Sequence, residues 1–185
     1  QIRKWNMTFI QGDILDKDLI NKYCKDADVI HHLAGITDVP RVKSESTFEK
    51  EELIRKVAEE GTQNILDAIS NECKIIMPSS HVVYEGLDSI KKNIKEDEKT
   101  CPSLAYGKSK DINEKQLKDS GKNFVILRLA SVYGYSTDTA RIDIMANFFA
   151  KTASQNGTLR LFAAGKQIKS LVPLIDVARC FKFME

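Results

Sequence analysis

Hydrophobic and polar positions alternate along this chain in two different periods. Short apolar runs rich in β-branched residues are typical of buried strands, and they occur at residues 7–10, 27–33, 74–77 and 123–129. Between them, apolar residues recur every three or four positions, which predicts helices over residues 16–25, 46–70, 106–120 and 142–155. Strands that alternate with helices of this length predict an α/β fold with a parallel sheet and helices on both sides.

The details of this pattern lead to expectations about packing. Residues 27–33 suit a strand buried on both faces, and Pro78 is expected to end the strand 74–77, because proline cannot donate to a ladder. Within the helix 46–70, Gly61 is a weak point. The buried stripe of that helix is expected to consist of Leu53, Val57, Ile65, Ala68 and Ile69.

The regular pattern changes in two places. Residues 86–100 form a charged segment without periodicity, and the pattern loosens again after Gly134. We therefore expect a first domain over residues 1–135 and part of a small second domain over residues 136–185. The chain opens at Gln1 without methionine and stops within an amphipathic helical pattern at residues 181–185, so we expect it to be incomplete at both ends.

The composition is that of an ordinary globular protein, with 42% apolar and 29% charged residues among 185. A formal charge of +2 favours neither nucleic acid nor a membrane as partner, so a small molecule is expected. The four cysteines are scattered, and the adjacent His31 and His32 would point to opposite faces of a strand, so no disulfide framework and no metal site are predicted. Reduced thiols suit a cytoplasmic protein, and no run approaches the roughly 18 apolar residues of a membrane span.

Two segments carry candidate chemistry. Tyr106 and Lys110, in YGKSK, are four residues apart at the start of a predicted helix, so their side chains share one face. A free tyrosine has a pKa of about 10, and a neighbouring ammonium favours the phenolate, so the pair suits an acid/base, although Tyr-x-x-x-Lys also arises by chance. Ser79 and Ser80 follow a predicted strand, where ligands bind in open α/β sheets, although serines there more often cap a turn.

Five segments, in order along nearly the whole chain, resemble the extended short-chain dehydrogenase/reductase family. They are GDI at residues 12–14, HLAG at 32–35, PSSHVVYEG at 78–86, YGKSK at 106–110 and LRLASVYG at 127–134. The resemblance implies a Rossmann-like doubly wound parallel sheet and a bound nicotinamide cofactor, NAD or NADP. The cofactor-binding residues that it implies are Asp13, Ile14, Leu33, Ala34, Gly35, Tyr106 and Lys110.

The same resemblance implies a nucleotide-sugar epimerase whose catalytic residues are Ser80, Tyr106 and Lys110. Tyr106 would move a proton at a sugar hydroxyl while hydride passes between the sugar carbon and the nicotinamide ring. Ser80 would share that hydrogen bond, and Lys110 would bind the ribose and lower the pKa of Tyr106. Ser80, Ser131 and Lys169 would contact the substrate, and the two long helices would form a homodimer.

Departures from the family pattern narrow the activity and keep alternatives open. His81 and Val82 stand where 4,6-dehydratases carry an acidic pair and related decarboxylases a glutamate, which leaves an epimerase or a carbonyl reductase. Ala58 and Ser131 replace asparagines, and Lys169 replaces an arginine that clamps the diphosphate. A carbonyl reductase of the same family and a noncatalytic nucleotide-sensing protein with this fold are therefore the alternatives.

The family's glycine-rich GxxGxxG turn, which brings a helix N-terminus to the pyrophosphate, does not occur in the sequence. In the strand order 3-2-1-4-5-6 the first two strands form the centre of the sheet. The predicted strands 7–10 and 27–33 would then share no neighbour. We expect the first two strands to have been lost from the sequence or to be supplied by another chain.

Overall fold

The structure is a computed structural model that describes residues 7–37, 47–135, 141–166 and 168–185. No helix within these ranges is long and apolar enough to cross a membrane. In chain order the elements are α1 (Lys17–Cys24), β1 (Val29–His31), α2 (Phe48–Ala68), β2 (Lys74–Ser80), the 3-10 helix η3 (His81–Tyr84), α3 (Ala105–Asp119), β3 (Asn123–Leu129), β4 (Ser131–Tyr133), α4 (Met145–Ser154), the 3-10 helix η4 (Phe162–Gly165), β5 (Leu171–Pro173) and α5 (Leu174–Met184).

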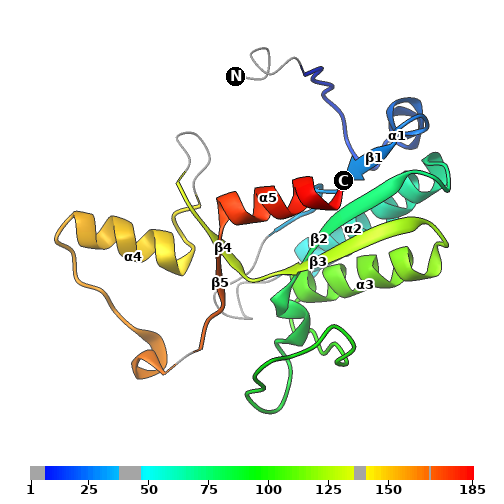
Figure 1. Ribbon diagram of the computed structural model, residues 1–185. Helices are drawn as coiled ribbons and strands as arrows, with labels where there is room; N and C mark the ends of the chain where they lie inside the picture. The colour runs from blue at the N-terminus through cyan, green and yellow to red at the C-terminus, as the bar shows by residue number, and fades with distance from the viewer. Residues whose placement is uncertain (1–6, 38–46, 136–140, 167) are drawn as a thin grey trace.

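Three parallel strands form the main sheet in the order β1-β2-β3, with β2 in the middle. Helices α2 and α3 cover one face of this sheet, and α5 packs on the other (Figure 1). The carboxyl ends of β2 and β3 lie side by side, because Ser80 pairs with Leu129 in the register of the ladder. The predicted α/β fold with helices on both sides is confirmed.

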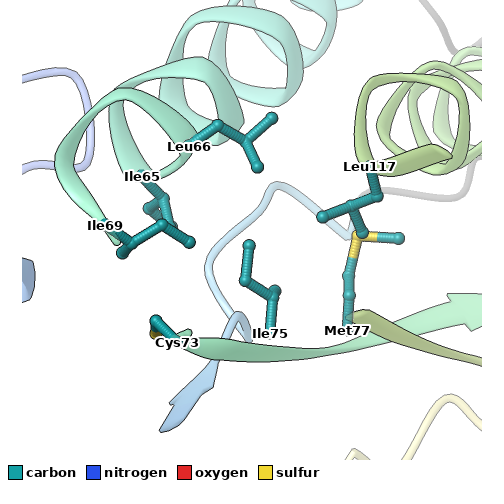
Figure 2. Packing of buried hydrophobic residues seen from close by; sticks show 7 residues of the cluster. All are labelled: Ile65, Leu66, Ile69, Cys73, Ile75, Met77 and Leu117. Atoms are coloured by element: carbon teal, nitrogen blue, oxygen red, sulfur yellow. The ribbon is translucent and has the colours of Figure 1, made fainter. Parts of the chain in front are cut away.

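The core lies on both faces of β2. Side chains of α2, α3 and β2 point toward one another in one cluster, shown in Figure 2: Ile65, Leu66, Ile69, Cys73, Ile75, Met77 and Leu117. On the opposite face, Ile76 packs against Val177 and Phe181 of α5. Successive residues of a strand point to opposite faces, so Ile75 and Ile76 serve two cores. Burying such a side chain contributes about 1.5–3 kcal/mol, which explains why this strand is a continuous apolar run.

Most predicted elements are observed within a few residues of their expected bounds. The helices over 16–25, 106–120 and 142–155 are α1, α3 and α4, and the strand over 123–129 is β3. The helix over 46–70 is α2, although residue 46 lies outside the described residues. Local caps fix two starts: Asp16 Oδ1 accepts from Leu19 N at 3.0 Å, and Thr47 Oγ1 accepts from Lys50 N at 3.3 Å.

Of the two strands predicted near the start of the chain, the first is wrong and the second is confirmed over fewer residues. Residues 7–10 form no strand, and Met7, Phe9 and Ile10 are exposed. A strand needs a neighbour for its backbone groups, and no strand in the described ranges pairs with this segment. The strand over 27–33 is reduced to β1, and its His31 is exposed. Ile30 packs against the core beneath α2 and α3, and Val29 packs against the core beneath α5, so β1 is half-buried on both faces rather than fully buried.

Pro78 does not end β2, contrary to the prediction, and the strand continues to Ser80. Lys74 N donates to Asp28 O, and Ile76 O accepts from His32 N, so even-numbered residues of β2 direct their backbone groups toward β1. The nitrogen of Pro78 points the same way, but β1 pairs only as far as Ile76. The missing N–H of the proline therefore falls where β2 has no partner on that side.

The buried face of α2 also differs from the prediction. Ile65 is buried as expected, but Leu53 is half exposed, and Ile54 and Ala58 are buried instead. Small and polar residues belong to this face because α3 packs there: Asn113 Nδ2 donates to Ala58 O and to Thr62 Oγ1, each at 2.8 Å. A count of apolar positions alone could not detect a face that includes Gly61 and Thr62.

The residues after β3 form a separate ribbon and then return to the main sheet. Strands β4 and β5 pair in parallel, from Ser131 with Leu171 to Tyr133 with Pro173. Helix α4 has no buried residue among those described and lies apart from the main sheet in Figure 1. Helix α5 contributes Val177 and Phe181 to the core of the main sheet. The division of the chain at residue 135 stays a prediction.

Gly61 marks a close approach between α2 and the segment before α1. A Cβ atom at Gly61 would lie 2.8 Å from Cγ2 of Ile14 and 3.2 Å from two further atoms of that side chain. The residue expected to be a weak point of the helix is therefore what allows Ile14 to pack on α2.

We expect Gly61→Ala to lower the free energy of unfolding by about 1 kcal/mol. Overpacking costs about 1–3 kcal/mol, which exceeds the gain of up to about 1 kcal/mol in helix propensity. The control is Gly35→Ala, because a Cβ there would meet nothing within 4 Å. Urea denaturation measures both variants, and a Gly61→Ala protein as stable as the unmodified chain would contradict this account of the packing.

Candidate active site

The carboxyl end of β2 meets the first turn of α3, and this contact brings two predicted catalytic residues together. Ser80 is the last residue of β2, and Tyr106 is the second residue of α3. The Tyr106 phenol lies close enough to Ser80 for the serine side chain to lower its pKa. Ser80 Oγ also accepts from Val82 N at 3.4 Å and so caps η3. Ser80 therefore has both the capping role and the contact with Tyr106 that its position suggested.

A glycine permits this close approach. A Cβ atom at Gly107 would lie 3.0 Å from Val82 O and 3.1 Å from Pro102 Cβ, which is tighter than ordinary contact. Gly107 is also buried. A larger residue at this position would push the first turn of α3 away from the segment that follows Ser80.

Lys110 lies one helical turn after Tyr106, on the same side of α3. Its Nζ is 5.9 Å from the centroid of the Tyr106 ring, within the range of a cation–π contact. The side chain is 8% exposed, and burial lowers the pKa of Lys110. The predicted pairing of these two side chains on one helix face is therefore observed.

The environment of Tyr106 acts on its pKa in both directions. Burial raises the pKa, whereas the hydrogen bond with Ser80 and the positive charge of Arg141 lower it, and the net change is an increase. The lowering expected from Lys110 is thus not seen. Sequence reasoning missed Arg141, because it lies in a loop without periodicity. Its guanidinium also pairs with Asp143 at 2.7 Å.

A buried polar network lies behind Lys110. His32 follows β1, is 4% exposed, and places Nε2 2.8 Å from Thr62 Oγ1. The other ring nitrogen, Nδ1, is the one buried side-chain N or O atom of the described residues without a hydrogen-bond partner. Burial, together with the charge of Lys110, lowers the pKa of His32 to about 4. His31, by contrast, points to the other face of the sheet and packs edge-on against Phe181.

Four of the predicted cofactor residues line one cavity of about 290 Å³ between α1 and the end of β1: Asp13, Ile14, Leu33 and Ala34. The cavity is mainly apolar, with Ile20, Tyr23 and Ile30 in its wall, and His32 joins it to the surroundings of Lys110. Gly35, the fifth of these residues, is exposed and does not line it. The Asp13 carboxylate can accept hydrogen bonds from ligand hydroxyls, and the apolar wall can cover a flat ring. The volume is at the small end of ligand pockets, so the cavity fits one end of a dinucleotide.

Of the predicted substrate residues, Ser131 begins β4, and Lys169 lies two residues before β5. Ser131 N donates to Ser170 O at 3.1 Å, so the ribbon brings the two positions close together. Neither side chain makes a hydrogen bond with Ser80, Tyr106 or Lys110 in the described part of the chain. His81 Nδ1 lies 3.1 Å from Leu129 O, as expected of a packed residue.

The model of the NAD dependent epimerase/dehydratase family matches residues 1–184. The chain belongs to this family. The catalytic Ser80–Tyr106–Lys110 arrangement predicted from the sequence therefore lies in the expected fold, a Rossmann-like α/β structure. The roles of the individual residues remain predictions.

Relatives and solved structures agree with the family. CDP-paratose 2-epimerase of Salmonella typhi is 27% identical over 93% of this chain and 58% of its own length. A probable low-salt glycan biosynthesis reductase of Haloferax volcanii is 29% identical over 82% of this chain and 49% of its own. UDP-glucuronic acid 4-epimerase from Bacillus cereus, solved with UDP-glucuronic acid and NAD, superposes with a TM-score of 0.76 at 26% identity, over 98% of this chain and 57% of its own. The chain thus spans about half the length of these proteins.

We expect the stability of the chain to fall as the pH is lowered from about 6.5 to about 4. The unfolded chain binds a proton at His32 near pH 6.5, but the folded chain binds it only near pH 4. Between these values the unfolded state holds more protons, so up to about 3 kcal/mol of unfolding free energy is lost. Urea denaturation across this range should show a smaller pH slope for His32→Gln, and equal slopes for both proteins would disprove the assignment.

Proposed function

We propose that this chain is the catalytic part of an NAD-dependent epimerase that acts on a nucleotide-linked sugar through transient oxidation. The observation that carries the proposal is that Ser80, Tyr106 and Lys110 come together at the carboxyl end of a parallel strand, with Lys110 Nζ 5.9 Å from the Tyr106 ring. Ligands bind at such strand ends in open α/β sheets. Membership of the epimerase/dehydratase family supports the reaction class.

In this proposal Tyr106 is the acid/base at the sugar hydroxyl that is oxidised and later restored. Ser80, which lies beside Tyr106, binds the same sugar hydroxyl. The proton then moves between oxygens that are held in fixed positions. The charge of Arg141 stabilises the phenolate form of Tyr106 whenever it has given up its proton. The burial of Tyr106 and Lys110 keeps bulk water from the reacting atoms.

The cofactor would be held by the cavity beside β1 and by Lys110. Asp13, Ile14, Leu33 and Ala34 line that cavity, with Gly35 next to it, and Lys110 would reach the ribose of the nicotinamide half. When bound, NAD accepts and returns the hydride of the sugar carbon. The NAD in the structure of the Bacillus cereus relative supports this choice of cofactor over NADP.

A carbonyl reductase of the same family is the second candidate. The Haloferax volcanii relative, named as a probable reductase, favours it. Ser131 and Lys169, proposed to contact the substrate, are exposed or half-buried at the β4–β5 ribbon and carry one hydroxyl and one ammonium. An ammonium binds phosphate as a point charge rather than through a bidentate fork, so Lys169 is compatible with either substrate class.

We also propose a cytoplasmic homodimer that pairs through the outer faces of α2 and α3. These are the two longest helices of the described residues, and they pack side by side (Figure 1). Light scattering at micromolar concentration tests the dimer, and a monomeric mass would refute it.

Tyr106→Phe should lower kcat by about 10²- to 10⁴-fold, because it removes the proton donor and acceptor but keeps the ring. The affinity for NAD, measured by calorimetry, should stay close to that of the unmodified protein. The control is Ser154→Ala, which removes an exposed hydroxyl at the end of α4, outside the cofactor cavity, and should leave kcat unchanged. Turnover that survives Tyr106→Phe would support a noncatalytic or differently catalysed function instead.

Cofactor retention should separate the epimerase from the reductase. An epimerase returns the hydride to the sugar in each cycle and needs no external reductant, so we expect protein purified by gel filtration to convert nucleotide sugars without added NAD. A reductase would release oxidised cofactor and stop until NADH or NADPH is supplied. Activity that depends on added NADH in proportion to product would overturn the epimerase assignment.

A further inference from the structure

A buried carboxylate lies on α3 two turns beyond Tyr106, and the mechanism above does not use it. Glu114 is 1% exposed, and both of its oxygens are hydrogen-bonded. Oε1 accepts from Ser79 Oγ at 2.5 Å and from Arg128 Nε at 2.9 Å. Oε2 accepts from Arg128 Nη2 at 2.6 Å and from Lys118 Nζ at 3.3 Å. We call these four residues the Glu114 cluster.

The Glu114 cluster joins three elements at one point. Ser79 and Arg128 are direct partners in the β2–β3 ladder, and Glu114 reaches both from α3. Ser79 immediately precedes Ser80, while Glu114 lies eight residues after Tyr106, about 12 Å along the helix axis. Strand β2 and helix α3 are therefore hydrogen-bonded through Ser79 and Glu114, and they meet again where Ser80 approaches Tyr106.

The charges of the Glu114 cluster make this connection hard to rearrange. Burial by itself would raise the pKa of Glu114, but the hydrogen bonds from Arg128 and Ser79 outweigh it and hold the pKa below its usual value. A buried ion that loses a partner is left uncompensated, which is strongly unfavourable. Arg128 also donates to Glu96 O at 3.0 Å and to the Tyr84 hydroxyl, so the same guanidinium holds the segment after η3.

We propose that Glu114 and Ser79 are positioning residues: their hydrogen bond fixes the end of β2 against α3 and so sets the contact between Ser80 and Tyr106. The proposal deepens the proposed function, on which it rests for its catalytic meaning. Its structural content, that removal of the Ser79 hydroxyl loosens the contact between Ser80 and Tyr106, is independent of turnover.

Ser79→Ala is the informative variant. It removes one hydrogen bond but leaves Glu114 paired with Arg128 and Lys118, so the chain keeps its buried ion pair and its fold. Glu114→Gln would instead leave the Arg128 guanidinium without its counter-charge, and would test folding rather than position. Ser79→Thr retains the hydroxyl and serves as the rescue. Ser103→Ala is the matched control, because Ser103 also donates to a carboxylate, that of Glu85 at 3.3 Å, but is exposed.

The readout is the ¹³C resonance of the Tyr106 Cζ atom at neutral pH, assigned with Tyr106→Phe, because this atom senses the hydrogen bond of its hydroxyl. We expect Ser79→Ala to shift the resonance toward its position in Ser80→Ala, while Ser79→Thr and Ser103→Ala leave it unchanged. A Ser79→Ala resonance at the unmodified position overturns the proposal, whether or not Ser80→Ala moves it.

Kinetics on the protein that carries this chain then test the catalytic meaning. Ser79→Ala should lower kcat about tenfold while KM changes less than about twofold, since it disturbs an interaction at the reacting hydroxyl rather than substrate binding. A shifted resonance in a protein that turns over no nucleotide sugar would refute the proposed function and keep the positioning role. An unshifted resonance in an active enzyme would refute the positioning role and keep the proposed function.

Discussion

The carboxylate of Glu114 can be buried only while Arg128 and Ser79 hold it, and the arrangement of the candidate active site depends on this constraint. An isolated buried carboxylate costs several kcal/mol, so the native packing must bring β2, β3 and α3 to one point. The apolar cluster of Ile75, Met77 and Leu117 holds the same three elements together less specifically, because hydrophobic contact tolerates small shifts in register. The apolar core therefore gives the interface its stability, and the ion pair between Glu114 and Arg128 fixes its register.

This constraint explains why the residues proposed for catalysis are held by more contacts than the residues proposed to bind the cofactor. Ser80, Tyr106 and Lys110 lie on elements that are packed on the core and tied by hydrogen bonds. Asp13 and Leu33 are exposed and lie in segments outside the helices and strands. Their cavity is held by fewer contacts, chiefly Ile14 against Gly61 and the bond from Asn64 Nδ2 to Ile14 O at 3.0 Å. Pre-organisation is thus concentrated where proton transfer is proposed.

The wrong predictions share a cause, which is that each element was judged from its own residues. Pro78 was expected to end a strand because proline lacks an N–H, yet the loss is harmless where β1 has already ended. Residues 7–10 have the composition of a strand but no partner among the described strands. The buried face of α2 was assigned from apolar spacing, whereas hydrogen bonds from Asn113 of α3 to Ala58 and Thr62 place these two residues on that face. In each case the outcome depended on a neighbouring strand or helix, and the local sequence pattern does not say which element that neighbour is.

The sequence by itself determined the alternation of helices and strands from α1 to β3, the spacing that puts Tyr106 and Lys110 on one helix face, and the family. These follow from local periodicity and from motifs whose residues lie close together along the chain. The tertiary structure brought Ser80 to Tyr106, as the family resemblance implied, and it alone decided that Arg141 lies near the phenol and that Glu114 joins Ser79 and Arg128. The reason is physical: these contacts join residues up to dozens of positions apart, and only the packing of strands and helices sets the distances between them.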